Sequence, residues 1–194
     1  MSEVDEATDR VLMGPAKVSK QITEKEKKLV SIHEAGHAVI GIKLEDANEV
    51  HKITIIPRGM AGGYTMMLPK EEKNLVLTKK ELLSEITGLL GGRVSEEMFL
   101  GEISTGASDD FKKATRIARS MVTEYGMSDL GVVQYEEQEG SVFLGRDYGK
   151  TKNFSDQVAL EIDRETRKII DECYENCKKI IKENKGLIML LSDA

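Results

Sequence analysis

The chain has 194 residues, of which 40% are hydrophobic and 32% are charged, and its formal net charge is −6. A chain of this size and composition folds as one domain, or as one domain with a helical appendage, and can bury a core without disulfides. Acidic and basic residues are mixed without a basic stripe and aromatic residues are few, which argues against nucleic acid as a partner.

The cysteines and the lengths of the apolar segments indicate in which cellular compartment the chain is expected to lie. Cys173 and Cys177 are four residues apart in a helical pattern, so they are expected to be two buried thiols on one helix face rather than a disulfide framework. The N-terminus is polar and does not resemble a signal peptide, and no window holds about 18 consecutive apolar residues. The sequence therefore predicts no membrane span and a reducing compartment, the cytosol or its organellar equivalent.

The N-terminal part of the chain is expected to be an arm followed by a long helix. Residues 1–22 mix charged and small residues, with a short helix near 6–13. Thr23 and Glu26 form a capping box, which starts a helix. The apolar spacing that follows predicts a long, largely buried helix over roughly 24–44.

Two strands and a second long helix are predicted next. Residues 50–57 are rich in β-branched side chains and residues 64–68 resemble a second strand after a glycine-rich turn. Thr78 and Glu81 form another capping box, which starts a helix over 79–99. This helix contains three glycines, Gly88, Gly91 and Gly92. Interior glycines weaken a helix, so we expect either a close approach of another helix or a break near residues 91–93.

The C-terminal part is predicted to be mostly helical. A helix is expected to begin with Ser108 as its N-cap and to end at Gly126. Residues 131–137 and 140–146 suggest two short strands joined by an acidic turn. A long helix over 155–184 and a further short helix complete the chain. The predicted fold class is therefore mainly α with a small β-sheet, an α+β domain.

The segment "SIHEAGHAVIG" at residues 31–41 carries the main functional signal. Residues four apart on a helix lie one turn apart on the same face, so the imidazoles of His33 and His37 can converge on one zinc ion. Glu34 lies beside the first histidine, where it can take a proton from water at the metal as a general base. Charged side chains in an apolar stripe are costly unless they are paired or bind a metal.

A third metal ligand must come from elsewhere, and spacing alone does not choose it. The chain has one more histidine, His51, at the start of a predicted strand. The other candidates are acidic residues on helices that could pack on the motif helix: Glu96, Glu97, Asp109 and Asp110. The segment "GRDYGKT" at 145–151 is one residue short of a phosphate-binding loop, so nucleotide binding is not expected here.

Several segments in order resemble a known family. "TDRVLMGPAK", "HEAGHAVIG", "VHKITIIPRG", "LLGGRVSEE", "STGASDDFKKATRIARSMVTEYGMS" and "GSVFLGRD" closely resemble the peptidase domain of FtsH, the membrane-anchored AAA zinc protease family. The resemblance covers nearly the whole chain. It implies a helical zinc-peptidase domain with a small sheet, with residues 1–22 as an arm from an ATPase module, 23–150 as the peptidase core and 151–194 as a helical segment, expected to be truncated.

The resemblance also implies roles for single residues. One zinc ion per chain would be held by His33, His37 and Asp110, with Glu97 as the alternative third ligand, and Glu34 would be the catalytic base. The strand after the glycine-rich turn, at about residues 63–68, resembles the edge that receives substrate as an added strand. Such an edge recognises the backbone of the substrate rather than its side chains. The implied substrate-binding residues are Gly63, Tyr64, Thr65 and Met66.

The remaining expectations concern the parent protein. The family implies a homo-hexamer that hydrolyses unfolded polypeptides delivered by an ATP-dependent unfoldase ring, in membrane and soluble protein quality control. ATP would bind only in the ATPase module, and membrane contact would come only through an anchor, at the cytoplasmic face or its organellar equivalent; both segments are missing from this chain. The alternative function is a non-catalytic, zinc-containing oligomerisation module.

Overall fold

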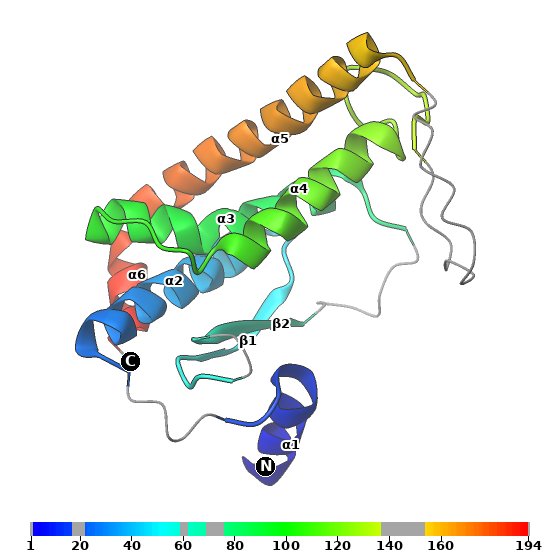
Figure 1. The fold of residues 1–194 in the computed structure, drawn as a ribbon. Coiled ribbons are helices and arrows are strands. Elements are labelled where there is room, and N and C mark those ends of the chain that lie inside the picture. The colour runs from blue at the N-terminus through cyan, green and yellow to red at the C-terminus, as the bar shows by residue number, and fades with distance from the viewer. Residues whose placement is uncertain (1, 17–21, 59–61, 69–75, 137–153, 194) are drawn as a thin grey trace.

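The computed structural model describes residues 2–16, 22–58, 62–68, 76–136 and 154–193, and Figure 1 shows their arrangement. Two short strands and a set of helices make up the described chain. The helices are α1 (Ser2–Met13), α2 (Glu24–Lys43), α3 (Lys79–Leu100), α4 (Ser108–Thr123), α5 (Asp156–Glu183) and α6 (Lys185–Ser192). The strands are β1 (Glu49–Thr54) and β2 (Tyr64–Leu68). The predicted α+β class is confirmed.

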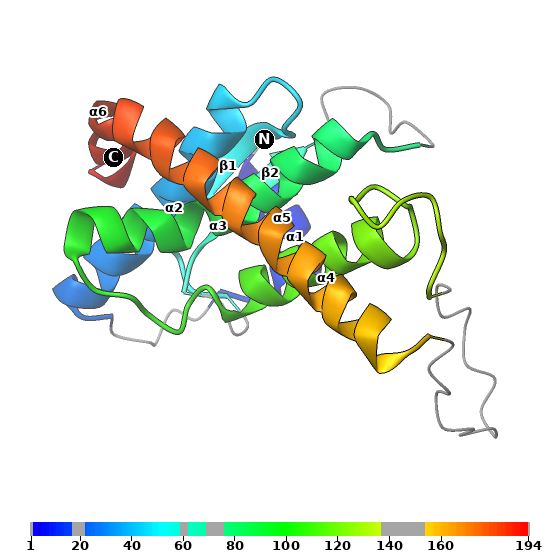
Figure 2. The ribbon, with the colours of Figure 1, turned by 90° about the horizontal axis from the view of Figure 1, so that it is seen from above.

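The core lies where α3 meets its neighbouring helices. Helix α3 packs against α2, α4 and α5, and α6 packs against α2. Figure 2 shows α5 crossing over α3 and α4. Apolar side chains from all five helices form one buried cluster, which includes Ile40, Ile86, Met121, Ile162 and Ile188. Among the described residues, the backbones of α2 and α4 do not come close to each other, and α3 packs against both helices.

Glycines allow the closest contact in this core. A Cβ atom added to Gly36 of α2 would lie 2.3 Å from the carbonyl oxygen of Gly91, so the two backbones touch at this crossing. Helix α3 runs unbroken from Lys79 to Leu100. The predicted close approach is therefore confirmed. The alternative, a break near residues 91–93, is wrong, because the glycines lie within a continuous helix where they let α2 come close.

The helix starts follow the local sequence in most cases. Both predicted capping boxes form, at Thr23 with Glu26 and at Thr78 with Glu81. The predicted cap of α4 is wrong: Ser108 is the first helical residue, and the preceding Ala107 caps the helix without a side-chain hydrogen bond. The long C-terminal helix forms as predicted, with the two thiols buried on its inner face. Burial raises the pKa of both thiols, so they are expected to be unreactive at neutral pH.

The strands β1 and β2 form an antiparallel hairpin on one side of α2. Thr65 pairs with Ile53, and the register shifts between Val50 and Lys52. Strand β1 ends at Thr54, three residues before the predicted end, so the predicted range 50–57 is too long at its C-terminal end.

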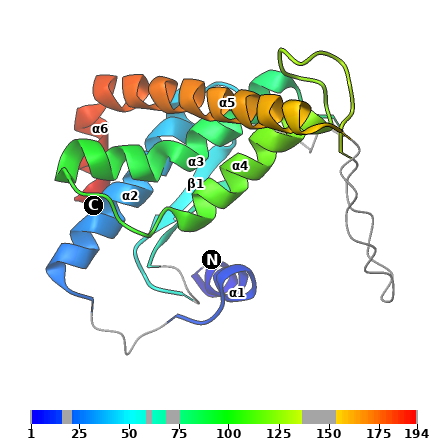
Figure 3. The same ribbon diagram turned by 45° about the horizontal axis from the view of Figure 1, so that its top comes forward.

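Ion pairs attach α1 to the other side of the hairpin, where it lies apart from the helical core (Figure 3). The Arg58 guanidinium donates to the Glu6 carboxylate at 2.5 Å and lies 3.6 Å from the Asp9 carboxylate. Lys52 donates to Asp9 at 2.5 Å. Asp9 and Arg58 are buried. The short helix predicted near residues 6–13 is thus part of a longer helix held to the sheet by charge.

The two further strands that the sequence suggested are not found in the described residues. The backbone N–H groups of Tyr135 and Glu136 both donate to the Thr123 carbonyl at the end of α4, so residues 131–136 follow α4 as a loop instead of pairing as a strand. The other suggested strand, 140–146, lies outside the described residues. No helix in the described part of the chain is both long and apolar enough to cross a membrane.

Candidate metal centre

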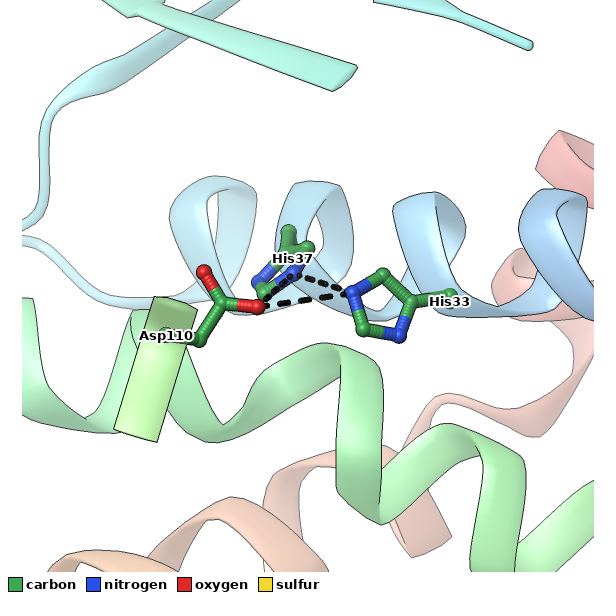
Figure 4. A group of neighbouring side chains, drawn as sticks. All are labelled: His33, His37 and Asp110. Carbon is green, nitrogen blue, oxygen red and sulfur yellow. Dashed lines mark hydrogen bonds and ion pairs between the residues drawn. The ribbon is translucent and has the colours of Figure 1, made fainter. Parts of the chain in front are cut away.

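Helix α2 carries the first three side chains of the candidate site. His33 and His37 lie one turn apart on it, and their Nε2 atoms are 3.0 Å from each other (Figure 4). The rings meet edge to face, with centroids 4.7 Å apart. Both side chains are about nine-tenths buried. The two imidazoles therefore point at one location, as the spacing in the sequence predicts.

Asp110 reaches the same location from the first turn of α4. Its Oδ2 atom lies 3.5 Å from Nε2 of His33 and 3.6 Å from Nε2 of His37 (Figure 4). A carboxylate in the first turn also interacts favourably with the positive end of the helix dipole. Among the described residues, His33, His37 and Asp110 form the group of side chains that could hold a metal ion.

The size of this group fits zinc. The three donor atoms form a triangle with sides of 3.0, 3.5 and 3.6 Å. The nearest point equidistant from all three corners lies about 2.0 Å from each, which matches the Zn–N and Zn–O distances found in proteins. Two imidazole nitrogens and one carboxylate oxygen are also ligands that zinc prefers, and three protein ligands leave a fourth position for water or substrate, as in catalytic sites.

Helix α3 holds the outer nitrogen of each imidazole. Nδ1 of His33 lies 2.6 Å from Oε1 of Glu96, and Nδ1 of His37 lies 2.8 Å from the carbonyl oxygen of Gly88. A carbonyl and a carboxylate both accept, so each ring carries a proton on Nδ1, and its Nε2 faces the site as the atom that would bind a metal ion after losing any proton it carries. Such outer partners orient metal-binding histidines and increase their basicity.

The Glu96 carboxylate is also held by Ser104, in the segment between α3 and α4. Its side chain is fully buried. The backbone N–H of Ser104 donates to Oε2 at 2.7 Å and the Ser104 hydroxyl donates to Oε1 at 3.0 Å. These partners and His33 outweigh the effect of burial and lower the pKa of Glu96. The sequence indicated Glu96 as one of four acidic candidates for the third ligand, and its contact with the outer nitrogen of His33 was not predicted.

The other candidate ligands lie elsewhere. Glu97, the alternative third ligand, accepts a short hydrogen bond from the Tyr174 hydroxyl and lies 3.5 Å from the Lys178 ammonium, both on α5. His51 and Asp109 are exposed. The structure does not bring any of these three side chains into the group around His33 and His37.

Glu34 lies beside the first histidine and is buried. The Thr65 hydroxyl lies 2.7 Å from its Oε2 atom. Burial raises the pKa of Glu34, and the nearby histidines and Thr65 oppose this shift. A carboxylate with a raised pKa is a stronger proton acceptor than an exposed one, which suits a general base.

The histidines and the carboxylates of the site shift one another's pKa values. Burial lowers the pKa of His33, but hydrogen bonds to Asp110 and Glu96 raise it more, to about 9. Burial raises the pKa of Asp110, but the two histidines lower it well below its usual range. A proton held among these groups competes with a metal ion, because metal ligands must be deprotonated.

The four residues implied in substrate binding lie at the start of β2 or just before it. Tyr64 faces α1, where burial and the Asp9 carboxylate raise the pKa of its hydroxyl to about 12. Gly63 and Thr65 face α2. Met66 is half-buried. Strand β2 pairs with β1 along one edge, and no described strand pairs with its other edge.

Comparison with known proteins agrees with this geometry. The model of peptidase family M41 matches residues 20–194. The chain is 62% identical over 188 residues to the ATP-dependent zinc metalloprotease FtsH of Acholeplasma laidlawii, which covers 97% of this chain and 29% of that protein. It is 56% identical over 192 residues to the protein of the same name in Bacillus subtilis, covering 98% of this chain and 30% of that protein. The chain thus spans less than a third of these relatives, and it belongs to peptidase family M41.

Proposed function

We propose that this chain is a zinc-dependent endopeptidase domain that hydrolyses peptide bonds of unfolded polypeptides. The observation that carries the proposal is the triangle of His33, His37 and Asp110, whose size fits one zinc ion. The names of the relatives, ATP-dependent zinc metalloproteases, agree with it. These relatives are named as ATP-dependent, and by family resemblance an ATP-dependent unfoldase would deliver the substrate.

Each side chain of the site has a part in this chemistry. His33, His37 and Asp110 would hold the ion, which supplies a Lewis acid that polarises a carbonyl and lowers the pKa of water. Glu34 accepts the proton from the attacking water and passes it to the leaving amine. Glu96 and the Gly88 carbonyl keep the two imidazoles in the required tautomer. Burial around the group strengthens each of these electrostatic interactions.

The open edge of β2 suits an unfolded substrate. An extended peptide can add to an unpaired edge as a further strand and bind through backbone hydrogen bonds. Gly63, Tyr64, Thr65 and Met66 would form the part of this edge nearest to Glu34. Binding through the backbone gives little sequence preference, which agrees with a role in protein quality control.

The assembly and the division of the chain are also proposals. By family resemblance, residues 1–22 would link to an ATPase module, 23–150 would form the peptidase core and 151–194 a helical segment, in a homo-hexamer attached to the cytoplasmic face of a membrane or its organellar equivalent. A non-catalytic structural zinc site would be expected to have four protein ligands. The described residues provide three and place Glu34 beside them, which disfavours that alternative.

The test uses a permanently unfolded protein as substrate. We expect this chain to cleave it, a chelator to stop cleavage and added zinc to restore it. Glu34→Gln should lower kcat by about 10²–10⁴-fold, because general acid–base catalysis is lost, while the bound zinc remains. Glu85→Gln, at an exposed position on α3, is the matched control and should keep full activity. Undiminished cleavage by Glu34→Gln would overturn the proposal.

A further inference from the structure

We propose that Thr65 is a positioning residue for the Glu34 carboxylate, a role distinct from any backbone contact of β2 with substrate. The inference rests on the proposed peptidase function and deepens it. It starts from the hydrogen bond between the Thr65 hydroxyl and Oε2 of Glu34, at 2.7 Å. The same hydroxyl lies 3.1 Å from the backbone carbonyl oxygen of Glu34. One side chain on the hairpin thus contacts both the backbone and the side chain of the proposed base.

The direction of Thr65 follows from its place in the strand. Successive side chains of a strand point to opposite faces. Gly63 and Met67 lie against α2: a Cβ atom on Gly63 would lie 2.7 Å from a methyl group of Val30, and one on Gly41 would lie 2.9 Å from the end of Met67. Thr65, between them, therefore faces α2 as well, whereas Tyr64 faces α1.

The strand is anchored on both sides of Thr65. Gly63 has no room for a side chain, since a Cβ atom there would lie 2.6 Å from the Thr54 carbonyl oxygen and 3.2 Å from Cγ of Glu34. Met67 packs on Gly41, seven residues along α2 from Glu34. Contacts before and after Thr65 therefore hold its part of the strand against α2.

This hydroxyl is the described hydrogen-bond partner of the Glu34 carboxylate. Among the described residues, no other side-chain hydrogen bond to the Glu34 carboxylate is found. The bond restrains the position of Oε2 and leaves Oε1 to accept from water. A base displaced by about 1 Å can cost 10²-fold in rate, so this orientation is important for catalysis.

A hydroxyl is also suited to both states of a base that gains and returns a proton. It donates to Oε2 when Glu34 is a carboxylate. When Oε2 carries a proton, the hydroxyl can accept from it and donate to the Glu34 carbonyl instead. Serine retains this ability and valine, which has the same shape as threonine, does not.

The experiment compares Thr65→Val and Thr65→Ser in the present chain, with cleavage of an unfolded protein as the assay. We expect Thr65→Val to lower kcat by about 10–10²-fold with KM unchanged, because the lost interaction is with the base and not with the substrate. Zinc content should stay at the original level. Thr65→Ser should retain most of kcat. In a Glu34→Gln background, Thr65→Val should lower kcat no further, because the two residues act as a unit.

Thr123→Val is the matched control. Thr123 is fully buried and its hydroxyl donates to the Arg119 carbonyl at 2.9 Å, at the end of α4 far from Asp110. This variant loses a comparable buried hydrogen bond and should keep kcat. If Thr65→Val fails to fold, as judged by circular dichroism, Thr65→Ala replaces it, and the comparison with serine still isolates the hydroxyl.

The outcomes separate this inference from the proposed function. A raised KM with unchanged kcat in Thr65→Val would overturn the inference and assign Thr65 to substrate binding. Unchanged kcat and KM would overturn it too, while an inactive Glu34→Gln would still support the peptidase function. Full activity of Glu34→Gln would overturn the proposed function and the inference with it.

Discussion

Adjacent acidic residues on α3 have different environments because a helix turns between one residue and the next. Glu96 points into the core and meets His33, whereas Glu97 points to α5 and meets Tyr174 and Lys178. The Tyr174 hydroxyl lowers the pKa of Glu97, so this carboxylate stays charged without a metal. A similar contrast holds on α4, where Asp110 turns toward the histidines and Asp109 toward solvent.

This difference predicts how zinc content depends on single acidic residues. Asp110→Asn replaces a charged oxygen ligand by a neutral amide and should weaken zinc binding by more than the 10–100-fold typical of losing an outer partner. Glu97→Gln and the neighbouring control Asp109→Asn should keep their zinc. The measurement is metal content after dialysis against a zinc buffer. Equal loss in Asp110→Asn and Glu97→Gln would contradict the assignment of Asp110.

The sequence predicts the α2 part of the site and leaves the rest open for a physical reason. The spacing of His33 and His37 is a local property of one helix, so the sequence alone places them together. The third ligand depends on how α4 docks, and the sequence by itself narrowed it only to several candidates before the family resemblance. The contact of Glu96 with His33 depends on the register of α3 against α2, for which no local signal exists.

At the scale of elements, most of the structure is held by apolar packing and α1 is held by charge. Helices α2 to α6 share one apolar cluster, whereas α1 meets the hairpin through Glu6, Asp9, Lys52 and Arg58. The hydrogen bond from Lys52 lowers the pKa of Asp9, and that from Arg58 lowers the pKa of Glu6. The attachment of this helix should therefore depend on pH.

The direction of this pH dependence follows from the lowered pKa values. A carboxylate with a lowered folded-state pKa stabilises docking above its ordinary pKa, about 3.9 for aspartate, and this contribution is lost as pH falls toward the lower value. We expect NMR signals of α1 to move below about pH 4 while the helical core remains folded. Asp9→Asn should loosen α1 at neutral pH. Signals of α1 that stay unchanged in Asp9→Asn would contradict this.

The helices were predictable to within a few residues because capping boxes and apolar periodicity act locally. The suggested strand at 131–137 was wrong because alternation over a few residues also occurs in loops. There, residues 135 and 136 bond to the end of α4, a contact between segments that the pattern does not encode.

At the scale of the whole molecule, the candidate site joins two helices through their side chains. Among the described residues, the backbones of α2 and α4 do not come close to each other, and the side chains of His37 and Asp110 span the distance between them, 3.6 Å apart. A metal at this group would therefore connect two elements that are far apart in the sequence, and it would bind the folded state and not the unfolded one. Folding and metal binding should be linked.

This linkage predicts a large thermal effect. At free zinc 1,000 times above Kd, binding stabilises the fold by about 4 kcal/mol. For a chain of this size that raises Tm by roughly 8–16 °C. Differential scanning calorimetry with zinc and with a chelator measures the shift. Asp109→Asn should keep it and Asp110→Asn should lose most of it; a shift of equal size in Asp110→Asn would show that the stabilising ion binds elsewhere.

The hydrogen bonds between α3 and both imidazoles also affect which ionic radius the site accepts. The two rings are fixed with their donor nitrogens 3.0 Å apart by acceptors eight residues from each other on a single helix. A cation with longer bonds than zinc would have to spread the rings, and each ring could move only by stretching its bond to Gly88 or Glu96. The position of α3 against α2 therefore disfavours larger ions, in addition to the preference that comes from the chemistry of the ligands themselves.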